Sequence, residues 1–243
     1  MSRQFYDTLH RSYYPLDCAP ETSIGRNRRE RSQSIIRSCK PHRVLEVGFE
    51  SPDLSRMIAS LPDVEYVGVD ISEAAVNSAT EAGLQAFCVD VSEEKLPFGE
   101  HQFDLVYCAE VIEHLFNPDH AIEEFVRVLR PNGNILITTP NLASWYNRLV
   151  LLMGIQPLHT EISTLRILGR KFRLLGQGHR PVGHLRLYTL GGLVDLLNLH
   201  GLRVIAVEGY ALELLSSLWL VDVVMSKFVS LASGFIVLCK LNG

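Results

Sequence analysis

The sequence predicts an α/β protein whose sheet is mostly parallel and carries helices on both faces. Two observations favour this class. Short apolar runs typical of buried strands alternate with segments of helical periodicity, and acidic residues follow three of the expected strands. At 243 residues, 47% of them hydrophobic, the chain is long enough for one such domain with a large core. We therefore expect residues 1–243 to form a single domain.

The expected elements follow one another in a regular order. A basic segment at 23–38 is expected to be a surface helix, within an N-terminal helical cover that spans 1–41. Strands are expected at 43–47, 65–70, 85–89, 103–107 and 134–139, and helices at 54–60, 73–82 and 118–129. The alternation of strands and helices is interrupted at residues 142–190, where we expect a helical lid insertion. A helix at 191–200, a strand at 202–207, an apolar helical stretch and a strand at 235–239 then complete the chain.

Charge and cysteine usage limit the classes of function. The net charge of −4 gives no general attraction to nucleic acid, and the chain lacks the mixed basic and aromatic surface of a nucleic-acid binder. The five cysteines are scattered, and the first residues contain no apolar core of a secretion signal, so a cytoplasmic location is expected. Charged residues interrupt the apolar stretch at 211–239, which predicts core helix and strand rather than a membrane span.

Acidic residues mark the ends of three neighbouring strands. Glu46, Asp70 and Asp90 end the first, second and third strands, and Gly48 follows the first. In open α/β sheets, ligands bind beyond the carboxyl ends of the strands. Asp70 could hold both hydroxyls of a ribose, Asp90 an adenine amine and Glu46 an ammonium group. The alternative is that such acids only solvate loops or cap helices.

Four motifs together resemble the class I S-adenosylmethionine-dependent methyltransferases, and among them the small-molecule branch that includes the ubiquinone O-methyltransferases. The motifs are Val44-Leu-Glu-Val-Gly48, Val67-Gly-Val-Asp70, the segment 103–114 and the segment 129–141. The resemblance covers about 43–141 and weakly 184–207. It implies a Rossmann-like sheet of seven strands with the last one antiparallel, and S-adenosylmethionine as cofactor. The cofactor-binding residues that it implies are Glu46, Gly48, Phe49, Asp70, Ile71, Asp90, Val91 and Glu110.

One loop departs from the family pattern. Where relatives usually carry further glycines after the first strand, this chain has Glu50 and Pro52. A side chain at position 50 must avoid the methionine part of the cofactor or fill part of its space. This departure keeps a second hypothesis open, in which the fold is retained as a non-catalytic binding or regulatory subunit.

The segment after the fourth strand carries the candidate catalytic groups. Glu110, Glu113 and His114 form a Glu-x-x-Glu-His motif, which resembles a divalent-metal motif of some methyltransferases. A cation there could lower the pKa of an acceptor hydroxyl. A hydrogen-bonded cluster without a metal explains the same three residues, and we favour that interpretation over a metal site. His114 is the first candidate general base and His184 the second.

The lid segment mixes basic and apolar residues and contains no acid between Glu161 and Asp195. It predicts either recognition of an amphipathic, lipid-like acceptor and transient contact with a membrane surface, or a helical cover with solvated arginines. Its basic residues are Arg166, Arg170, Lys171, Arg173, Arg180 and Arg186. Trp145, Tyr146 and Tyr188 are candidate acceptor contacts, with core packing as the alternative. The sequence does not decide the oligomeric state, and a homodimer is one option.

The leading hypothesis is methyl transfer from S-adenosylmethionine to a small-molecule or amphipathic acceptor. The preference for oxygen as the methylated atom rests on the resemblance alone. A nicotinamide oxidoreductase is disfavoured because the G-x-G-x-x-G fingerprint is absent after the first strand.

Overall fold

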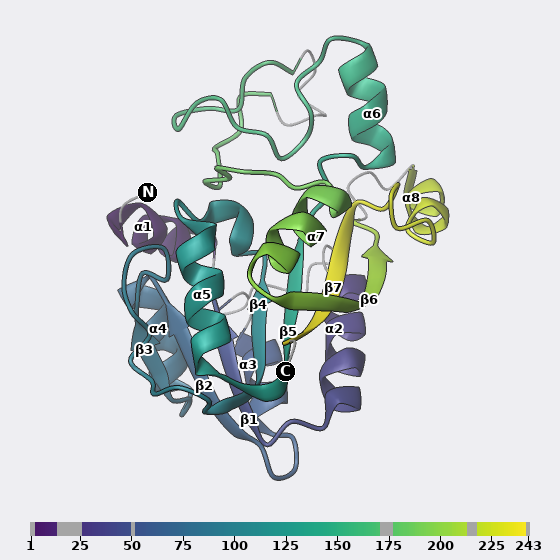
Figure 1. Ribbon diagram of the computed structural model, residues 1–243. Coiled ribbons are helices and arrows are strands. Elements are labelled where there is room, and N and C mark those ends of the chain that lie inside the picture. The colour runs from purple at the N-terminus through teal and green to yellow at the C-terminus, as the bar shows by residue number, and fades with distance from the viewer. Residues whose placement is uncertain (1–2, 14–25, 50–51, 171–176, 213–217, 242–243) are drawn as a thin grey trace.

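A seven-stranded sheet forms the centre of the molecule (Figure 1). The computed structural model describes residues 3–13, 26–49, 52–170, 177–212 and 218–241. The strand order is β3-β2-β1-β4-β5-β7-β6, and β7 alone runs antiparallel to its neighbours. This confirms the α/β class and the antiparallel last strand. The strands are β1 Arg43–Val47, β2 Glu65–Asp70, β3 Ala86–Cys88, β4 Phe103–Ala109, β5 Leu129–Pro140, β6 Leu202–Tyr210 and β7 Gly234–Leu241.

Side chains that alternate along the strands build a core on each face of the sheet. Leu45 and Val106 belong to the core that contains α5 (Pro118–Val128) and α7 (Leu190–Leu199). Val44 and Leu105 belong to the opposite core. That core is covered by α2 (Arg26–Cys39), α3 (Pro52–Ala59) and α4 (Glu73–Glu81). Helices on both faces follow from the right-handed crossovers between parallel strands.

The N-terminal residues form two helices in different places. α2 begins at Arg26 and packs on the sheet, close to the surface helix expected at 23–38. α1 (Arg3–Tyr13) lies instead against the start of α4, where Asp7 accepts hydrogen bonds from the Ser72 hydroxyl at 2.7 Å and the Ala74 N–H at 3.2 Å. This position brings α1 to the edge of the sheet where β1, β2 and β4 end (Figure 1).

The insertion between β5 and α7 is helical only in its first part. Its helix α6 (Trp145–Leu152) ends where Gly154 adopts a left-handed conformation with φ 66°. Beyond it, the described residues up to α7 form turns and loops, with Pro157 soon after the helix. The expected helical lid is therefore one helix followed by an irregular segment. Figure 1 shows this layer beyond the carboxyl ends of the parallel strands.

The apolar C-terminal region forms a helix and a strand, as predicted, but the helix does not belong to the core, because its residues Trp219, Leu220 and Val224 are exposed. α8 (Trp219–Met225) leads to β7, and the buried carboxylate of Asp222 accepts hydrogen bonds from the Trp145 indole, the Leu212 N–H and the Ser233 hydroxyl. These bonds join α8 to the start of α6. Within the described residues, no helix has the length and apolar character that a membrane crossing requires.

Candidate active site

A cavity of about 420 Å³ lies at the carboxyl ends of the strands, on the side of the switch between β1 and β4. This is where α/β sheets with this change of strand order bind ligands. A volume of this order is typical of small-molecule and cofactor sites. Its walls come from four strand ends, α1 and the lid. The lining residues include Tyr6, Leu9, Gly48, Phe49, Asp70, Ile71, Asp90, Val91, Ser92, Glu93, Glu110, His114, Phe116 and Val182.

Gly48 turns the chain at the end of β1. Its φ is 82°, and a Cβ atom at this position would meet Val111 Cγ2 at 2.4 Å. Glycine is thus required here for both backbone conformation and space. The next residue, Phe49, is buried and its ring covers Gly68 of β2. These contacts fix the first part of the loop. Glu50 lies outside the described residues.

Pro52 is the first residue of α3, a position where its missing N–H is not needed. The helix therefore begins two residues before the start expected at residue 54. Proline at this position is compatible with a helix that begins directly after the loop.

Asp70 ties the loop to the second strand end. One of its oxygens accepts the Phe49 N–H at 2.8 Å, and the other accepts the Ser72 N–H at 2.8 Å. Ser72 in turn caps α4 by accepting the Ala75 N–H. Asp70 therefore organises the loop, as the alternative interpretation of the strand-end acids expects. It also lines the cavity, so a ligand can reach it.

The third strand end forms another part of the wall. Asp90 and Val91 line the cavity with Ser92 and Glu93, and one Asp90 oxygen accepts the Ser92 N–H at 2.9 Å. Ile71 lies between the second and third strand ends along the same wall. The structure therefore gathers these implied cofactor residues around one space.

Glu46 is placed differently from the expectation. It is buried at 1% exposure within β1 and does not belong to the cavity lining. Its carboxylate accepts a hydrogen bond from the hydroxyl of Tyr66 on β2. The alternation of side chains along β1 explains this, because Glu46 lies on the face opposite to Leu45 and Val47. The geometry therefore does not favour direct contact between Glu46 and a ligand in this cavity.

Glu110 lies at the end of β4 and lines the cavity. Its φ is 54°, and its Oε1 accepts hydrogen bonds from Thr138 Oγ1 and Tyr210 OH, both at 2.9 Å. The buried guanidinium of Arg28 reaches the same oxygen at 3.6 Å. Three partners thus hold Glu110. Glu110 precedes the 3-10 helix η1 (Ile112–His114), which carries the other two residues of the Glu-x-x-Glu-His motif.

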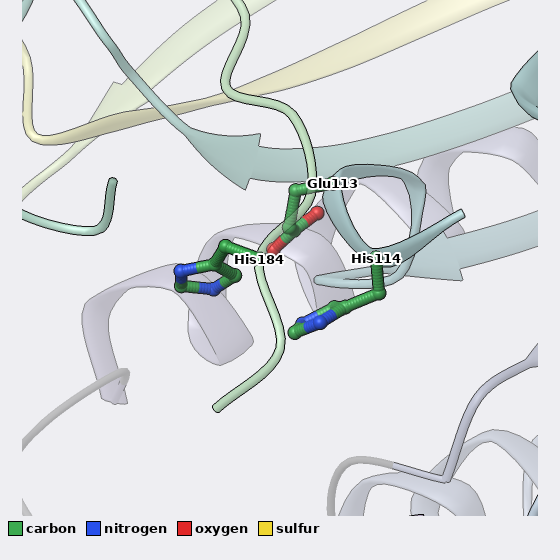
Figure 2. Close-up of side chains that lie close together, drawn as sticks. All are labelled: Glu113, His114 and His184. Atoms are coloured by element: carbon green, nitrogen blue, oxygen red, sulfur yellow. The ribbon is translucent and has the colours of Figure 1, made fainter. Parts of the chain in front are cut away.

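Glu113, His114 and His184 converge beside the cavity (Figure 2). The first two lie on η1 and the third comes from the lid, and potential ligand atoms of all three lie within 4.8 Å of one another. Glu113 is fully buried and accepts a hydrogen bond from the Thr139 hydroxyl at 3.0 Å. Burial, and next the nearby Glu110 carboxylate, raise the pKa of Glu113 well above its usual value.

Burial favours the neutral form of both histidines of this cluster. Burial, followed by the proximity of His184, lowers the pKa of His114 to about 3, and burial also lowers the pKa of His184. His114 lines the cavity, and its Nδ1 has no hydrogen-bond partner among the described residues. His184 Nδ1 lies 2.8 Å from the carbonyl oxygen of His159, which requires the proton on that nitrogen and leaves Nε2 as an acceptor.

A buried acid fixes the lid loop that carries His184. The carboxylate of Glu161 accepts the N–H groups of Val182 and Gly183 at 2.8 Å and that of His184 at 3.1 Å. Val182 thereby contributes to the cavity wall. The Glu113 carbonyl accepts the N–H groups that follow His184, at 2.9 and 3.0 Å. The lid and η1 are thus joined by backbone hydrogen bonds around the cluster.

Comparison with known proteins finds partial matches to methyltransferases. Residues 45–137 match the model of the methyltransferase domain. A ubiquinone biosynthesis O-methyltransferase from Alkalilimnicola ehrlichii is 28% identical over 130 residues, which are 51% of this chain and 52% of the relative. A ubiquinone/menaquinone biosynthesis C-methyltransferase UbiE from Ectopseudomonas mendocina is 31% identical over 105 residues, 40% of this chain and 41% of the relative.

The central part of the chain, residues 45–137, is therefore similar to the methyltransferases that depend on S-adenosylmethionine. The chain spans about half the length of the curated relatives that it matches. Among solved structures, the [4+2]-cyclase SpnF superposes with a TM-score of 0.61 at 15% identity, with 99% of this chain and 96% of that chain covered. At this identity the likeness supports the fold alone.

Several walls of this cavity were not foreseen from the sequence. Tyr6 and Leu9 reach it from α1, and Val182 from the lid. No motif marks them, because their position depends on how distant segments pack. Conversely, Trp145, Tyr146 and Tyr188 were candidate acceptor contacts but do not line the cavity. Packing explains them: the Trp145 indole donates to Asp222 at 2.9 Å, and the Tyr188 ring lies against the core.

Proposed function

We propose that this protein transfers the methyl group of S-adenosylmethionine to a hydroxyl of a small-molecule or amphipathic acceptor. The observation that carries the proposal is that one cavity contains the implied cofactor residues other than Glu46 together with the neutral imidazole of His114. The methyltransferase family implies the donor. Relatives are named as O-methyltransferases and as C-methyltransferases, so the choice of oxygen rests on the base beside the cavity.

The proposed cofactor site uses the strand ends. Gly48 and Phe49 give the methionine part access to the backbone, Asp70 accepts from the ribose hydroxyls, and Asp90 accepts from the adenine amine. Ile71 and Val91 supply apolar contact for the base, and Glu110 faces the ammonium group. When bound, the cofactor supplies an electrophilic methyl group next to the acceptor. Glu46 acts indirectly in this scheme, by holding Tyr66 beneath the loop.

His114 is the proposed general base. Because its pKa is about 3, the imidazole is unprotonated at neutral pH, and its Nδ1 has no hydrogen-bond partner among the described residues. The lone pair that takes the proton is assigned to this nitrogen. A hydroxyl placed against it loses its proton to the ring as the oxygen takes up the methyl group. His184 is proposed to orient and polarise His114, and the His159 carbonyl fixes the tautomer of His184. Alignment of donor and acceptor contributes the larger part of the rate.

A metal-assisted variant of the same reaction has one supporting observation. The oxygen of Glu113 and the ring nitrogens of His114 and His184 form a set that suits a transition metal or zinc better than magnesium. The set differs from the sequence motif, because three partners hold Glu110. We favour the metal-free variant, because burial favours the uncharged forms of Glu113, His114 and His184 alike.

A chelator distinguishes the two variants. Methyl transfer that persists in an excess of EDTA, and that added Zn²⁺ or Mn²⁺ does not raise, agrees with His114 as the base. Loss of activity in EDTA with recovery on Mn²⁺ would establish the metal-assisted variant instead.

A rival function is a binding or regulatory role without methyl transfer. The fold resembles that of a protein named as a [4+2]-cyclase, so proteins with this fold do not all carry the name of a methyltransferase. Mass spectrometry of the purified protein for bound adenine nucleoside, followed by incubation with methyl-labelled S-adenosylmethionine and a panel of phenols and lipid-like alcohols, separates the two. Labelled ether products support the proposal. Tight cofactor binding without product from any acceptor class would favour the rival.

The proposed surroundings are a reducing compartment, the cytoplasm, with no nucleic-acid partner. The four cysteines that the structure describes are free thiols, in agreement with this proposal. A homodimer is tested by light scattering in solution.

A further inference from the structure

The helices α6 and α8 expose many large apolar side chains. Leu152 is 85% exposed, Leu220 is 67% exposed and Trp219 is 44% exposed. Isolated exposed apolar residues are common, but a group on two elements that are joined to each other indicates an interaction surface. We call this group the α6–α8 surface; its members on the two helices and on the turns that follow them are Leu149, Leu151, Leu152, Met153, Trp219, Leu220, Val221, Val224 and Phe228.

Hydrogen bonds hold the two helices against each other. The Trp145 indole donates to Asp222 of α8 at 2.9 Å, and the Trp145 N–H donates to the Leu231 carbonyl at 2.9 Å. The Arg148 guanidinium donates to the Ser230 carbonyl at 3.0 Å. The N-terminal half of α6 is therefore fixed to α8 and to the turn after it. Figure 1 shows α6 and α8 together at the lid side of the molecule.

The exposed charged residues of the two segments that contain the α6–α8 surface all have the same sign. In the described parts of 142–194 and 218–233 the acids are Glu161 and Asp222, and both side chains are buried and hydrogen-bonded within the protein. Arg148, Arg166 and Lys227 are exposed in the same segments. This contrasts with the net charge of −4 of the whole chain. The exposed charge on this side is thus complementary to an anionic partner.

We propose that the α6–α8 surface docks this protein reversibly on an anionic lipid surface. Exposed leucines and an exposed tryptophan enter the interfacial region of a bilayer, while arginine and lysine contact the head groups. A second copy of the chain fits less well, since a twofold interface would place the same cations opposite one another without exposed acids to pair with them. The proposal goes beyond methyl transfer and does not depend on it.

Vesicle sedimentation tests the proposal. The probes are phosphatidylcholine vesicles and phosphatidylcholine vesicles with about one-third phosphatidylglycerol. The double variant Leu152→Glu/Leu220→Glu removes apolar contact, and Leu199→Glu is the control, because Leu199 is 75% exposed on α7, outside the α6–α8 surface. Lys227→Glu tests the charge. Circular dichroism melting and binding of S-adenosylhomocysteine show that each variant keeps its fold and its cavity.

The wild-type protein should bind the anionic vesicles, and added salt should weaken that binding. The double variant should bind at least about tenfold more weakly, Lys227→Glu several-fold more weakly, and Leu199→Glu about as well as the wild type. No sedimentation of the wild type with anionic vesicles would overturn the proposal, and so would an equal loss in the Leu199 control. A wild-type dimer that the double variant converts to a monomer, without vesicle binding, would assign the surface to a second copy instead. If the double variant fails to fold, Lys227→Glu and the salt dependence decide.

Discussion

The imidazole rings of His114 and His184 lie 4.7 Å apart between their centroids and are tilted by 40°. One ring follows β4, and the other is supplied by the lid, 70 positions later in the chain. Because the lid reaches η1 through backbone hydrogen bonds, the two rings are held together by both segments. Changes in the lid should therefore alter the protonation of the proposed base.

The rate of methyl transfer should not titrate near pH 6.5 in the wild type. The pKa of His114 is about 3, so its basic form is fully populated between pH 5 and 8. In His184→Ala the neighbouring ring is gone and water can enter, which should raise the pKa of His114. The pH–rate profile of that variant should then show an inflection above pH 3, with the rate falling on the acid side. An inflection near 6.5 in the wild type would contradict the assignment.

Stability should fall as the pH drops below about 6.5. Burial lowers the pKa of His159 to about 3, so the unfolded chain binds a proton between 6.5 and 3 and the native protein does not. The stabilisation is complete above 6.5 and is lost progressively toward pH 3, by about 1.4 kcal/mol per pH unit for one such group. Urea unfolding at several pH values should give a smaller slope for His159→Gln. The exposed His179, changed to Gln, should leave the slope as in the wild type.

Asp70→Asn should weaken cofactor binding by about ten- to a hundredfold, because a charged acceptor is lost from the cavity wall. The matched control is Asp104→Asn, which makes the same change at an acid that accepts the backbone N–H groups of His42 and Arg43 and does not line the cavity. Titration calorimetry with S-adenosylhomocysteine should separate the two variants, while both lower the melting temperature. Equal affinities in both variants would mean that Asp70 only organises the loop.

Local patterns predicted the fold and one side of the site. Apolar runs such as the one around Val44 identify buried strands, and Gly48 and Asp70 follow those strands directly. The carboxyl ends of parallel strands meet at one edge, so placing these residues together needs no knowledge of distant contacts. Glu46 could have been placed correctly too, since its position between Leu45 and Val47 puts it on the other face of the sheet.

The other side of the site could not be predicted in this way. His184 reaches His114 because Glu161 fixes the loop between them, an interaction of a buried acid with three backbone N–H groups that leaves no repeating pattern. Tyr6 belongs to a polar helix at the start of the chain, and its place depends on the contact of Asp7 with α4. Such long-range contacts are decided by packing and not by local preference.

Tyr6 is the residue of α1 with the clearest link to ligand binding. Its hydroxyl is buried without a hydrogen-bond partner among the described residues, and its ring contacts His114 edge-on at 6.0 Å between centroids. Burial, and then the nearby carboxylates, of which Asp90 is the foremost, raise the pKa of the Tyr6 phenol. The phenol therefore stays protonated and can donate a hydrogen bond into the cavity.

Tyr6→Phe should weaken ligand binding without destabilising the protein. The change removes a donor that lacks a partner in the protein, so the melting temperature should stay the same or rise slightly. If the hydroxyl donates to cofactor or acceptor, the Kd of the one or the KM of the other should increase about three- to tenfold, which corresponds to one hydrogen bond. Gln4→Ala, at an exposed position of the same helix, is the control and should change neither. Unchanged Kd and KM in Tyr6→Phe would show that the Tyr6 hydroxyl does not bind ligand. Weaker ligand binding in Tyr6→Ala alone would then show that the ring contributes only as part of the cavity wall.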